Sequence, residues 1–154
     1  MLKKIASFQM NHDLLTPGLY VSRIDGDCVT YDLRMKKPNG GDYLSLGALH
    51  TMEHLVATCL RSSDRADEVV YVGPMGCRTG FYIVMRASVS RADVLRLFRE
   101  AFAFTAGFEG SIPGARRREC GNFRAHSLPD ARREAAAYLE VLNRCGENTF
   151  DYPA

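Results

Sequence analysis

The sequence has no long apolar segment, no marked excess of charge and no repeated or low-complexity tract. Its 154 residues correspond to one domain. The hydrophobic and charged fractions, 46% and 25%, are close to the globular average and argue against intrinsic disorder. No run approaches the roughly 18 consecutive apolar residues of a membrane span, and residues 1–8 lack the apolar core of an export signal. We therefore expect a cytoplasmic protein with no membrane partner.

The charge balance and the cysteine pattern exclude two further classes. Lys and Arg total 20 and Asp and Glu total 18, and the net charge of +2 gives no general reason to expect nucleic-acid binding. The chain has five cysteines, an odd number, and none of them form a CxxC pair, so a disulfide framework is not expected. Reduced thiols fit better, and each can serve as a packing residue, a metal ligand or a reactive thiol.

The apolar periodicity predicts both strands and helices. Strands are predicted over residues 28–35, 69–72 and 81–87, the first with one apolar and one polar face. Helices are predicted over residues 45–62, from residue 90 to about 107, and from residue 127. The elements do not alternate strictly between strand and helix. We therefore expect an α+β fold, a single domain with a largely antiparallel sheet packed against three main helices.

The first long helix carries a candidate metal site. His50 and His54 are four residues apart, so they share one helix face and can hold one ion between them. Glu53 completes an H-x-x-E-H motif and can reach a water or a substrate without being a ligand. The alternative is an exposed pair of histidines beside an ordinary glutamate. A catalytic site also needs a third protein ligand and an open position. The candidates for that ligand are His12, His126, Cys77 and Cys120.

Cys77 is predicted to lie in a glycine-rich turn between two strands. Such a turn exposes a side chain, and the neighbouring Arg78 favours the thiolate form of a cysteine. The alternative is a small buried residue. Cys28 and Cys59 are typical packing residues, and Cys145 has no evident role.

Five segments together resemble the S-ribosylhomocysteine lyase (LuxS) family over nearly the whole chain. They are Ser7–His12, Asp32–Arg34 with Lys37–Asn39, His50–His54, Pro74–Tyr82, and Glu119–Asn122 with His126. The resemblance implies a single S-ribosylhomocysteine lyase-like domain over residues 1–154. It also implies a homodimer whose two active sites lie at the interface and are built from both chains, with a small-molecule substrate and no nucleic acid.

The resemblance further implies roles for individual residues. The family's metal ligands, with water as the fourth, are matched by His50, His54 and Cys120. One divalent ion per subunit is implied, Fe(II) natively, with Zn(II) or Co(II) as substitutes. The catalytic thiolate and the second acid/base are matched by Cys77 and Glu53. The substrate-contacting positions are matched by Ser7, His12 and Arg34.

The implied reaction cleaves the thioether of S-ribosylhomocysteine to homocysteine and 4,5-dihydroxy-2,3-pentanedione, the precursor of autoinducer-2. A Lewis acid can stabilise each enediolate while the carbonyl migrates toward the position that permits β-elimination. Each shift needs one group that removes a proton and one that returns it, work that Cys77 and Glu53 can divide. Arg34 is a plausible cation to hold Cys77 ionised. Many members carry Asp and Ser where this chain has Tyr71 and Gly73, so no polar substrate contact is carried over there.

Two other functions are compatible with the histidine motif. An inverzincin-type metallopeptidase shares H-x-x-E-H, but it is much longer, takes a downstream acidic ligand and leaves Cys77 without a role. A non-catalytic zinc-binding module is the second alternative, although a structural site normally has four protein ligands. An exchangeable water on the metal and thiol release from S-ribosylhomocysteine discriminate between these functions.

Overall fold

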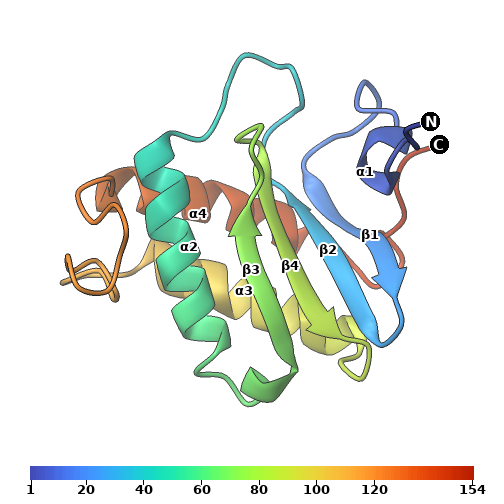
Figure 1. Ribbon diagram of the computed structural model, residues 1–154. Helices are drawn as coiled ribbons and strands as arrows, with labels where there is room; N and C mark the ends of the chain where they lie inside the picture. Colours follow the sequence, from blue (N-terminus) through green and yellow to red (C-terminus); the bar gives the residue numbers. More distant parts are fainter.

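Four antiparallel strands form one sheet: β1 (Gly18–Asp25), β2 (Cys28–Arg34), β3 (Val69–Pro74) and β4 (Gly80–Arg86). Their order in space is β1-β2-β4-β3 (Figure 1). This computed structural model describes residues 1–154. The predicted α+β fold with an antiparallel sheet is confirmed, and the three predicted strands end within two residues of the observed ones.

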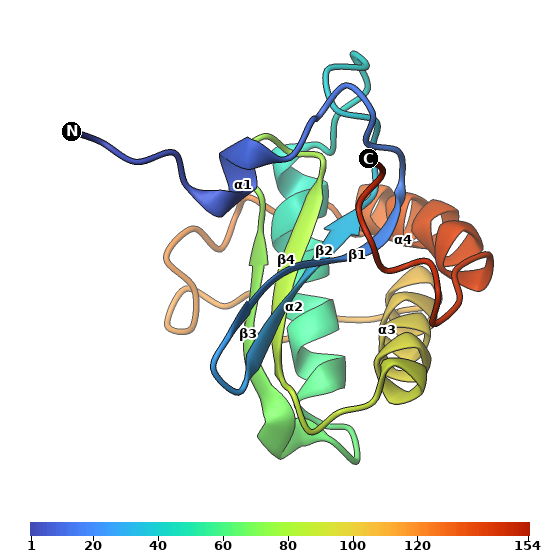
Figure 2. The same cartoon turned by 90° about the vertical axis from the view of Figure 1, so that its right-hand side faces the viewer.

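Three long helices accompany the sheet: α2 (Leu46–Leu60), α3 (Arg91–Ala106) and α4 (Leu128–Asn143). Each begins after a serine, Ser45, Ser90 or Ser127, whose hydroxyl accepts a hydrogen bond from a backbone N–H three residues on. Such a cap stabilises a helix by about 1 kcal/mol. Helices α3 and α4 lie on one side of the sheet, opposite the N-terminal segment (Figure 2). None of the helices is both long and apolar enough to cross a membrane.

A single core of 28 buried residues joins the helices to the inner face of the sheet. Strand β2 shows how the predicted alternation works. Val29, Tyr31 and Leu33 point into this core, and the polar residues lie on the opposite face. That opposite face was expected to be exposed, but Asp32 and Arg34 are 0% and 1% exposed. The strand is therefore buried on both faces at this end, because an ion pair and the segments over it exclude solvent.

Two N-terminal elements have no counterpart among the predicted ones. Helix α1 (Ala6–Gln9) is a single turn, too short for a periodic signal. Strand β1 is irregular, with a register shift between Val21 and Arg23, so its apolar residues do not alternate along its whole length. The hairpin between β1 and β2 closes at Gly26, whose φ of +58° is favourable for glycine.

Candidate active site

Four potential metal ligands converge beside helix α2. His50 and His54 project from the helix, and Cys120 and His126 come from the loop between α3 and α4. Their ligand atoms all lie within 4.8 Å of one another, and Cys120 Sγ is 3.3 Å from His50 Nε2. Of the four candidates for a third donor, the structure brings Cys120 and His126 to the histidine pair but leaves out His12 and Cys77.

The loop fixes the two helix histidines through their Nδ1 atoms. His50 Nδ1 donates to the carbonyl oxygen of Ala125, and His54 Nδ1 donates to that of Pro113, both at 2.8 Å. A carbonyl oxygen can only accept, so both rings carry their proton on Nδ1 and have a lone pair on Nε2. The two rings are nearly perpendicular, at 86°, which lets these lone pairs converge. This is the usual arrangement of histidines that bind metal.

His126 completes the group but is held differently. Its Nδ1 lies 3.0 Å from the hydroxyl of Thr51, and its ring stacks on that of His50 with centroids 3.8 Å apart. Its Nε2 is buried and has no hydrogen-bond partner in the protein. Burial, together with His50 and His54, lowers the pKa of His126 to about 4, so the ring is neutral at pH 7. The Nε2 lone pairs of His50 and His54, together with the Cys120 sulfur, fit a divalent transition metal.

The loop approaches the helix closely at Gly114. The φ of this residue is +70°, and a Cβ there would lie 3.1 Å from His54 Nδ1. Any side chain would strain the backbone and crowd the imidazole ring. Glycine at this position therefore allows the neighbouring carbonyl of Pro113 to accept from His54.

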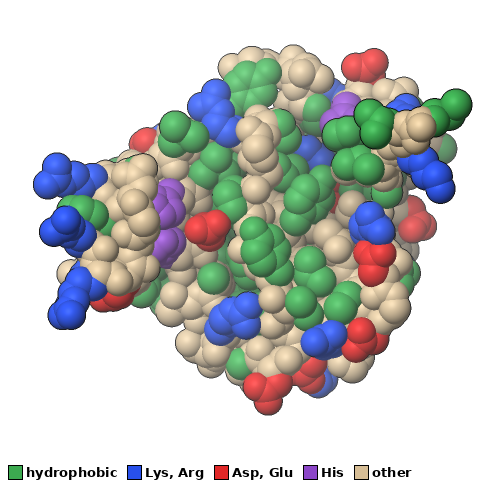
Figure 3. Space-filling view, viewed as in Figure 1, with side chains coloured by type: hydrophobic (Ala, Val, Ile, Leu, Met, Phe, Trp, Pro, Cys, Tyr) green, Lys and Arg blue, Asp and Glu red, His purple; other side chains and the backbone are tan.

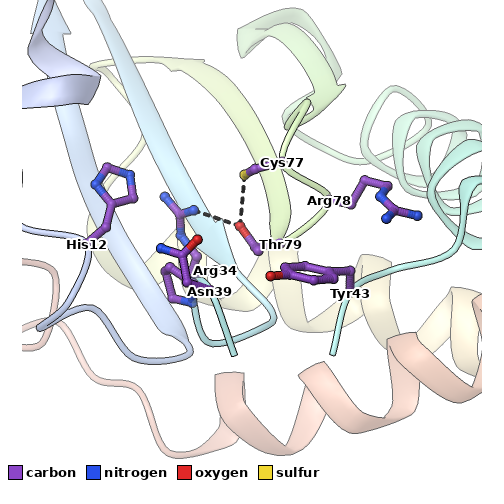
Figure 4. Close-up of a pocket in the computed structure, with 8 residues that line it drawn as sticks. His12, Arg34, Asn39, Tyr43, Cys77, Arg78 and Thr79 are labelled. Atoms are coloured by element: carbon purple, nitrogen blue, oxygen red, sulfur yellow. Dashed lines mark hydrogen bonds between the residues drawn. The ribbon is translucent and has the colours of Figure 1, made fainter. Parts of the chain in front are cut away.

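A second group of polar residues surrounds a pocket of about 260 Å³ (Figure 4). It is lined by His12, Arg34, Pro38, Asn39, Tyr43, Cys77, Arg78 and Thr79. A neighbouring hollow of about 330 Å³ shares His12, Arg34 and Cys77 and adds Ser7. The structure thus brings the three expected substrate-contacting residues together with Cys77.

Cys77 is connected to Arg34 through a third residue, Thr79. Arg34 Nη1 donates to Thr79 Oγ1 at 2.8 Å, and this oxygen lies 3.0 Å from Cys77 Sγ (Figure 4). Since the hydroxyl already accepts from Arg34, its own proton can point to the sulfur. We expected Arg34 to stabilise the Cys77 thiolate directly, but the two side chains are linked through Thr79. Arg78 does not stabilise the thiolate, because its guanidinium points away from the sulfur and lies over the ring of Tyr43.

Asp32 and Tyr152 hold Arg34 from the other side. The Asp32 carboxylate accepts from Arg34 Nε at 3.1 Å and from Nη2 at 2.6 Å, and it also accepts from the Tyr152 hydroxyl at 2.6 Å. Burial opposes the charge of Arg34, but Asp32 more than offsets this, and the pKa of the guanidinium is raised. Burial and the nearby Asp32 likewise raise the pKa of Tyr152. Sequence reasoning missed Thr79 and Tyr152 as parts of this network, and no spacing signal points to Tyr152.

Glu53 stands apart from both groups within one chain. It is half-buried on α2 next to His54 and forms no ion pair or side-chain hydrogen bond. Neither pocket near Cys77 is lined by Glu53 or by a member of the metal group. In Figure 3 histidine side chains reach the surface beside an acidic side chain, and hydrophobic side chains gather between them and the N-terminal segment. The exposed apolar side chains of the molecule include Ile5, Phe8, Leu46, Val70 and Tyr71.

Comparisons with known proteins agree over nearly the whole chain. A family model described as S-Ribosylhomocysteinase (LuxS) matches residues 5–148. An S-ribosylhomocysteine lyase of Phocaeicola vulgatus is 47% identical over 158 aligned positions, covering 99% of this chain and 98% of the relative. Proteins of the same name from Clostridium acetobutylicum and Borreliella afzelii are 43% and 41% identical, each with 99% of this chain aligned. The alignments cover 99% and 100% of these two relatives.

Proposed function

The chain belongs to the S-ribosylhomocysteine lyase (LuxS) family, and on that premise we propose how it cleaves the thioether of S-ribosylhomocysteine. The products are homocysteine and 4,5-dihydroxy-2,3-pentanedione. One observation carries the mechanism: the fold combines a nitrogen- and sulfur-rich metal group with a pocket that presents a thiol to solvent. A peptidase is not favoured, because the donor that joins the histidines is a cysteine and not an acidic residue.

His50, His54 and Cys120 would hold one divalent metal ion per chain. The free Nε2 lone pairs and the adjacent thiol support this ligand set, with Fe(II) as the native metal and Zn(II) or Co(II) as substitutes. When bound, the ion supplies a Lewis acid that polarises the sugar carbonyl.

Ser7 and His12 are proposed to bind the substrate. His12 Nδ1 donates to the carbonyl oxygen of Met10 at 3.0 Å, which leaves Nε2 to accept from a substrate hydroxyl. Arg34 lines the pocket, but its side chain is 1% exposed and its donors are shared between Asp32 and Thr79. We therefore assign Arg34 chiefly to orienting Cys77, and only secondarily to contact with the substrate.

Cys77 and Glu53 are proposed to move the protons. Each carbonyl shift takes a proton from one carbon and returns one to its neighbour, and the departing homocysteine sulfur ends as a thiol. A hydroxyl that donates to sulfur stabilises the thiolate, and this supports Cys77 as a base. Glu53 has an unpaired carboxylate beside the metal group, which supports it as the second acid/base.

We further propose a homodimer in which each site uses both chains. Within one chain the Cys77 pocket and the metal group share no lining residue, and exposed apolar side chains lie on the face between them (Figure 3). A second copy that covers this face would bury those side chains and could bring the two groups together. The five free cysteines support a reducing cytoplasm as its location, where the second product would serve as the quorum-sensing precursor of autoinducer-2.

Mixing two inactive variants tests the shared site. We expect Cys77→Ala and His54→Gln each to be inactive alone. After subunit exchange, half of the dimers would be mixed and each would have one intact site, so about a quarter of the wild-type rate returns. No recovery, with exchange verified by mass spectrometry of differently tagged chains, would show that each site is built from one chain.

Thiol release tests the chemistry. Metal-loaded wild-type protein should release homocysteine from S-ribosylhomocysteine, detected with a thiol reagent. Glu53→Gln and Cys77→Ala should each lower the rate at least about 100-fold and retain one metal ion per chain. Loss of metal in either variant would instead indicate a ligand, and no release by the metallated wild type would contradict the proposed function.

A further inference from the structure

The proton of the His126 ring can be placed from its neighbours. Thr51 Oγ1 accepts from the backbone N–H of Ser127 at 3.0 Å and lies 3.0 Å from His126 Nδ1. The hydroxyl donates to no other acceptor in the structure, which leaves its proton to point to Nδ1, and we assign the bond in that direction. A neutral imidazole that accepts at Nδ1 carries its own proton on Nε2. His126 is therefore the opposite tautomer to His50 and His54, whose Nε2 atoms are lone pairs.

Ring stacking gives a second, independent difference. The planes of His50 and His126 are 20° from parallel, with centroids 3.8 Å apart. Imidazole binds a metal along a lone pair in its own plane, at about 2.1 Å. Two nearly parallel ring planes at this separation cannot both contain the same ion at that distance. The ring planes of His50 and His54 are 86° apart, so one ion can lie in both of them. The geometry therefore excludes His126 as a ligand of an ion that His50 binds in its ring plane.

The Nε2–H of His126 has no acceptor within the chain. The nitrogen is buried and unpaired, although Cys120 and the two other histidines are within 4.8 Å. Leaving a buried N–H without a partner costs about 1–3 kcal/mol. An acceptor for this N–H must therefore come from outside the chain.

From these three observations we propose that His126 is a hydrogen-bond donor to the substrate and not a metal ligand. Its Nε2–H binds an oxygen of the sugar chain at the open side of the group formed by His50, His54 and Cys120. This donor is fixed before the substrate arrives, so it stabilises negative charge that develops on the oxygen when the adjacent carbon loses its proton. Thr51 is a positioning residue, because it sets the tautomer. The inference rests on the proposed lyase function.

Cobalt(II) binding by the full chain separates a ligand from a donor without turnover. His126→Gln keeps an N–H group, and His126→Phe keeps a flat ring without one. Both variants should bind one Co(II) with the wild-type visible spectrum, and their Kd should rise by no more than about 100-fold. His54→Gln is the matched control for a lost ligand and should change the spectrum. A spectrum altered in both His126 variants as in His54→Gln would overturn the proposal.

Kinetics then test the donor. Provided that the wild type releases homocysteine, the kcat of metal-loaded His126→Phe should be about 100-fold below that of the wild type, with little change in KM. The kcat of His126→Gln should lie close to that of the wild type, because glutamine keeps an N–H donor. Thr51→Val should lower kcat by about tenfold, and Thr51→Ser should restore it. Unchanged kcat in His126→Phe, or equal kcat in the two Thr51 variants, would overturn the proposal. If the wild type releases no thiol, the proposed function fails instead, and the cobalt spectra still decide whether His126 is a ligand.

Discussion

Replacing Thr79 with valine tests how Arg34 acts on Cys77. Valine has nearly the shape of threonine and carries a methyl group in place of the hydroxyl. The change removes the oxygen that accepts from Arg34 Nη1 at 2.8 Å and lies 3.0 Å from Cys77 Sγ. It leaves the other edge of the guanidinium paired with Asp32. The bridge between the cation and the sulfur is thus broken without removal of either group.

Two effects of Thr79→Val follow from the burial of this network. Arg34 is 1% exposed and Thr79 is 2% exposed, so the guanidinium N–H is left without water or partner, at a cost of about 1–3 kcal/mol. In a chain of 154 residues that cost should lower Tm by about 2–12 °C. The sulfur of Cys77 also loses a hydrogen-bond partner. If that bond contributes about 1.4 kcal/mol to the reactive form of the sulfur, alkylation slows about tenfold.

The assay is the rate of iodoacetamide alkylation at Cys77, followed by peptide mass spectrometry on metal-loaded protein at pH 7. Thr79→Val should react about tenfold more slowly than the wild type, and its lyase activity should fall in parallel. Thr79→Ser keeps the hydroxyl and is the matched control, with a rate within about threefold of the wild type. If Thr79→Val is alkylated as fast as the wild type, or if Thr79→Ser is as slow as Thr79→Val, Arg34 does not act on Cys77 through the Thr79 hydroxyl.

Three further changes have defined outcomes. Tyr152→Phe removes a donor from buried Asp32 and should lower the free energy of unfolding by about 1–3 kcal/mol. Folding raises the pKa of Tyr152 above 10, so the stabilisation by its hydroxyl is complete below pH 10 and declines above it. The difference in Tm between wild type and variant should therefore be larger at pH 8 than at pH 10.5. An equal Tm for the two proteins at pH 8 would contradict this stabilising role of the hydroxyl. Gly114→Ala, at a φ of +70°, should weaken zinc binding about tenfold in a chelator competition, and unchanged affinity would refute the packing argument. Zinc at 100 times its Kd should stabilise the protein by about 2.7 kcal/mol, raising Tm by about 5–10 °C; a similar rise in His54→Gln would count against the ligand assignment.

Short-range patterns explain what could be predicted from the sequence. His50 and His54 are four residues apart, and helix geometry alone puts them on one face. The serine caps of α2, α3 and α4 and the alternation of Val29, Tyr31 and Leu33 are equally local. These elements were therefore predicted to within a few residues, and the family was identified from motifs of the same short range. The residue roles and the dimer that the resemblance implied remain predictions.

Long-range packing explains what could not be predicted. Cys120 meets His50 across 70 residues of chain, so spacing could not distinguish it from the other candidate ligands. Burial of the Asp32–Arg34 pair depends on Tyr152, which is 120 residues from Asp32 in the sequence. The alternation in β2 indicates a polar face but not whether another segment covers it. Similarly, the hydroxyl that faces His126 Nδ1 comes from Thr51 on a different element, 75 residues away in the sequence.

We propose that this fold breaks the carbon–sulfur bond of S-ribosylhomocysteine by carbonyl migration and β-elimination. The most direct test is product analysis by mass spectrometry after incubation of metal-loaded protein with this substrate. The 1,2-dicarbonyl product can be trapped with 1,2-phenylenediamine. We expect homocysteine and trapped 4,5-dihydroxy-2,3-pentanedione in equal amounts, and at most about 1% of either product with Glu53→Gln over the same time. Intact substrate after incubation with the metallated wild type, or homocysteine released with an unrearranged sugar, would contradict it.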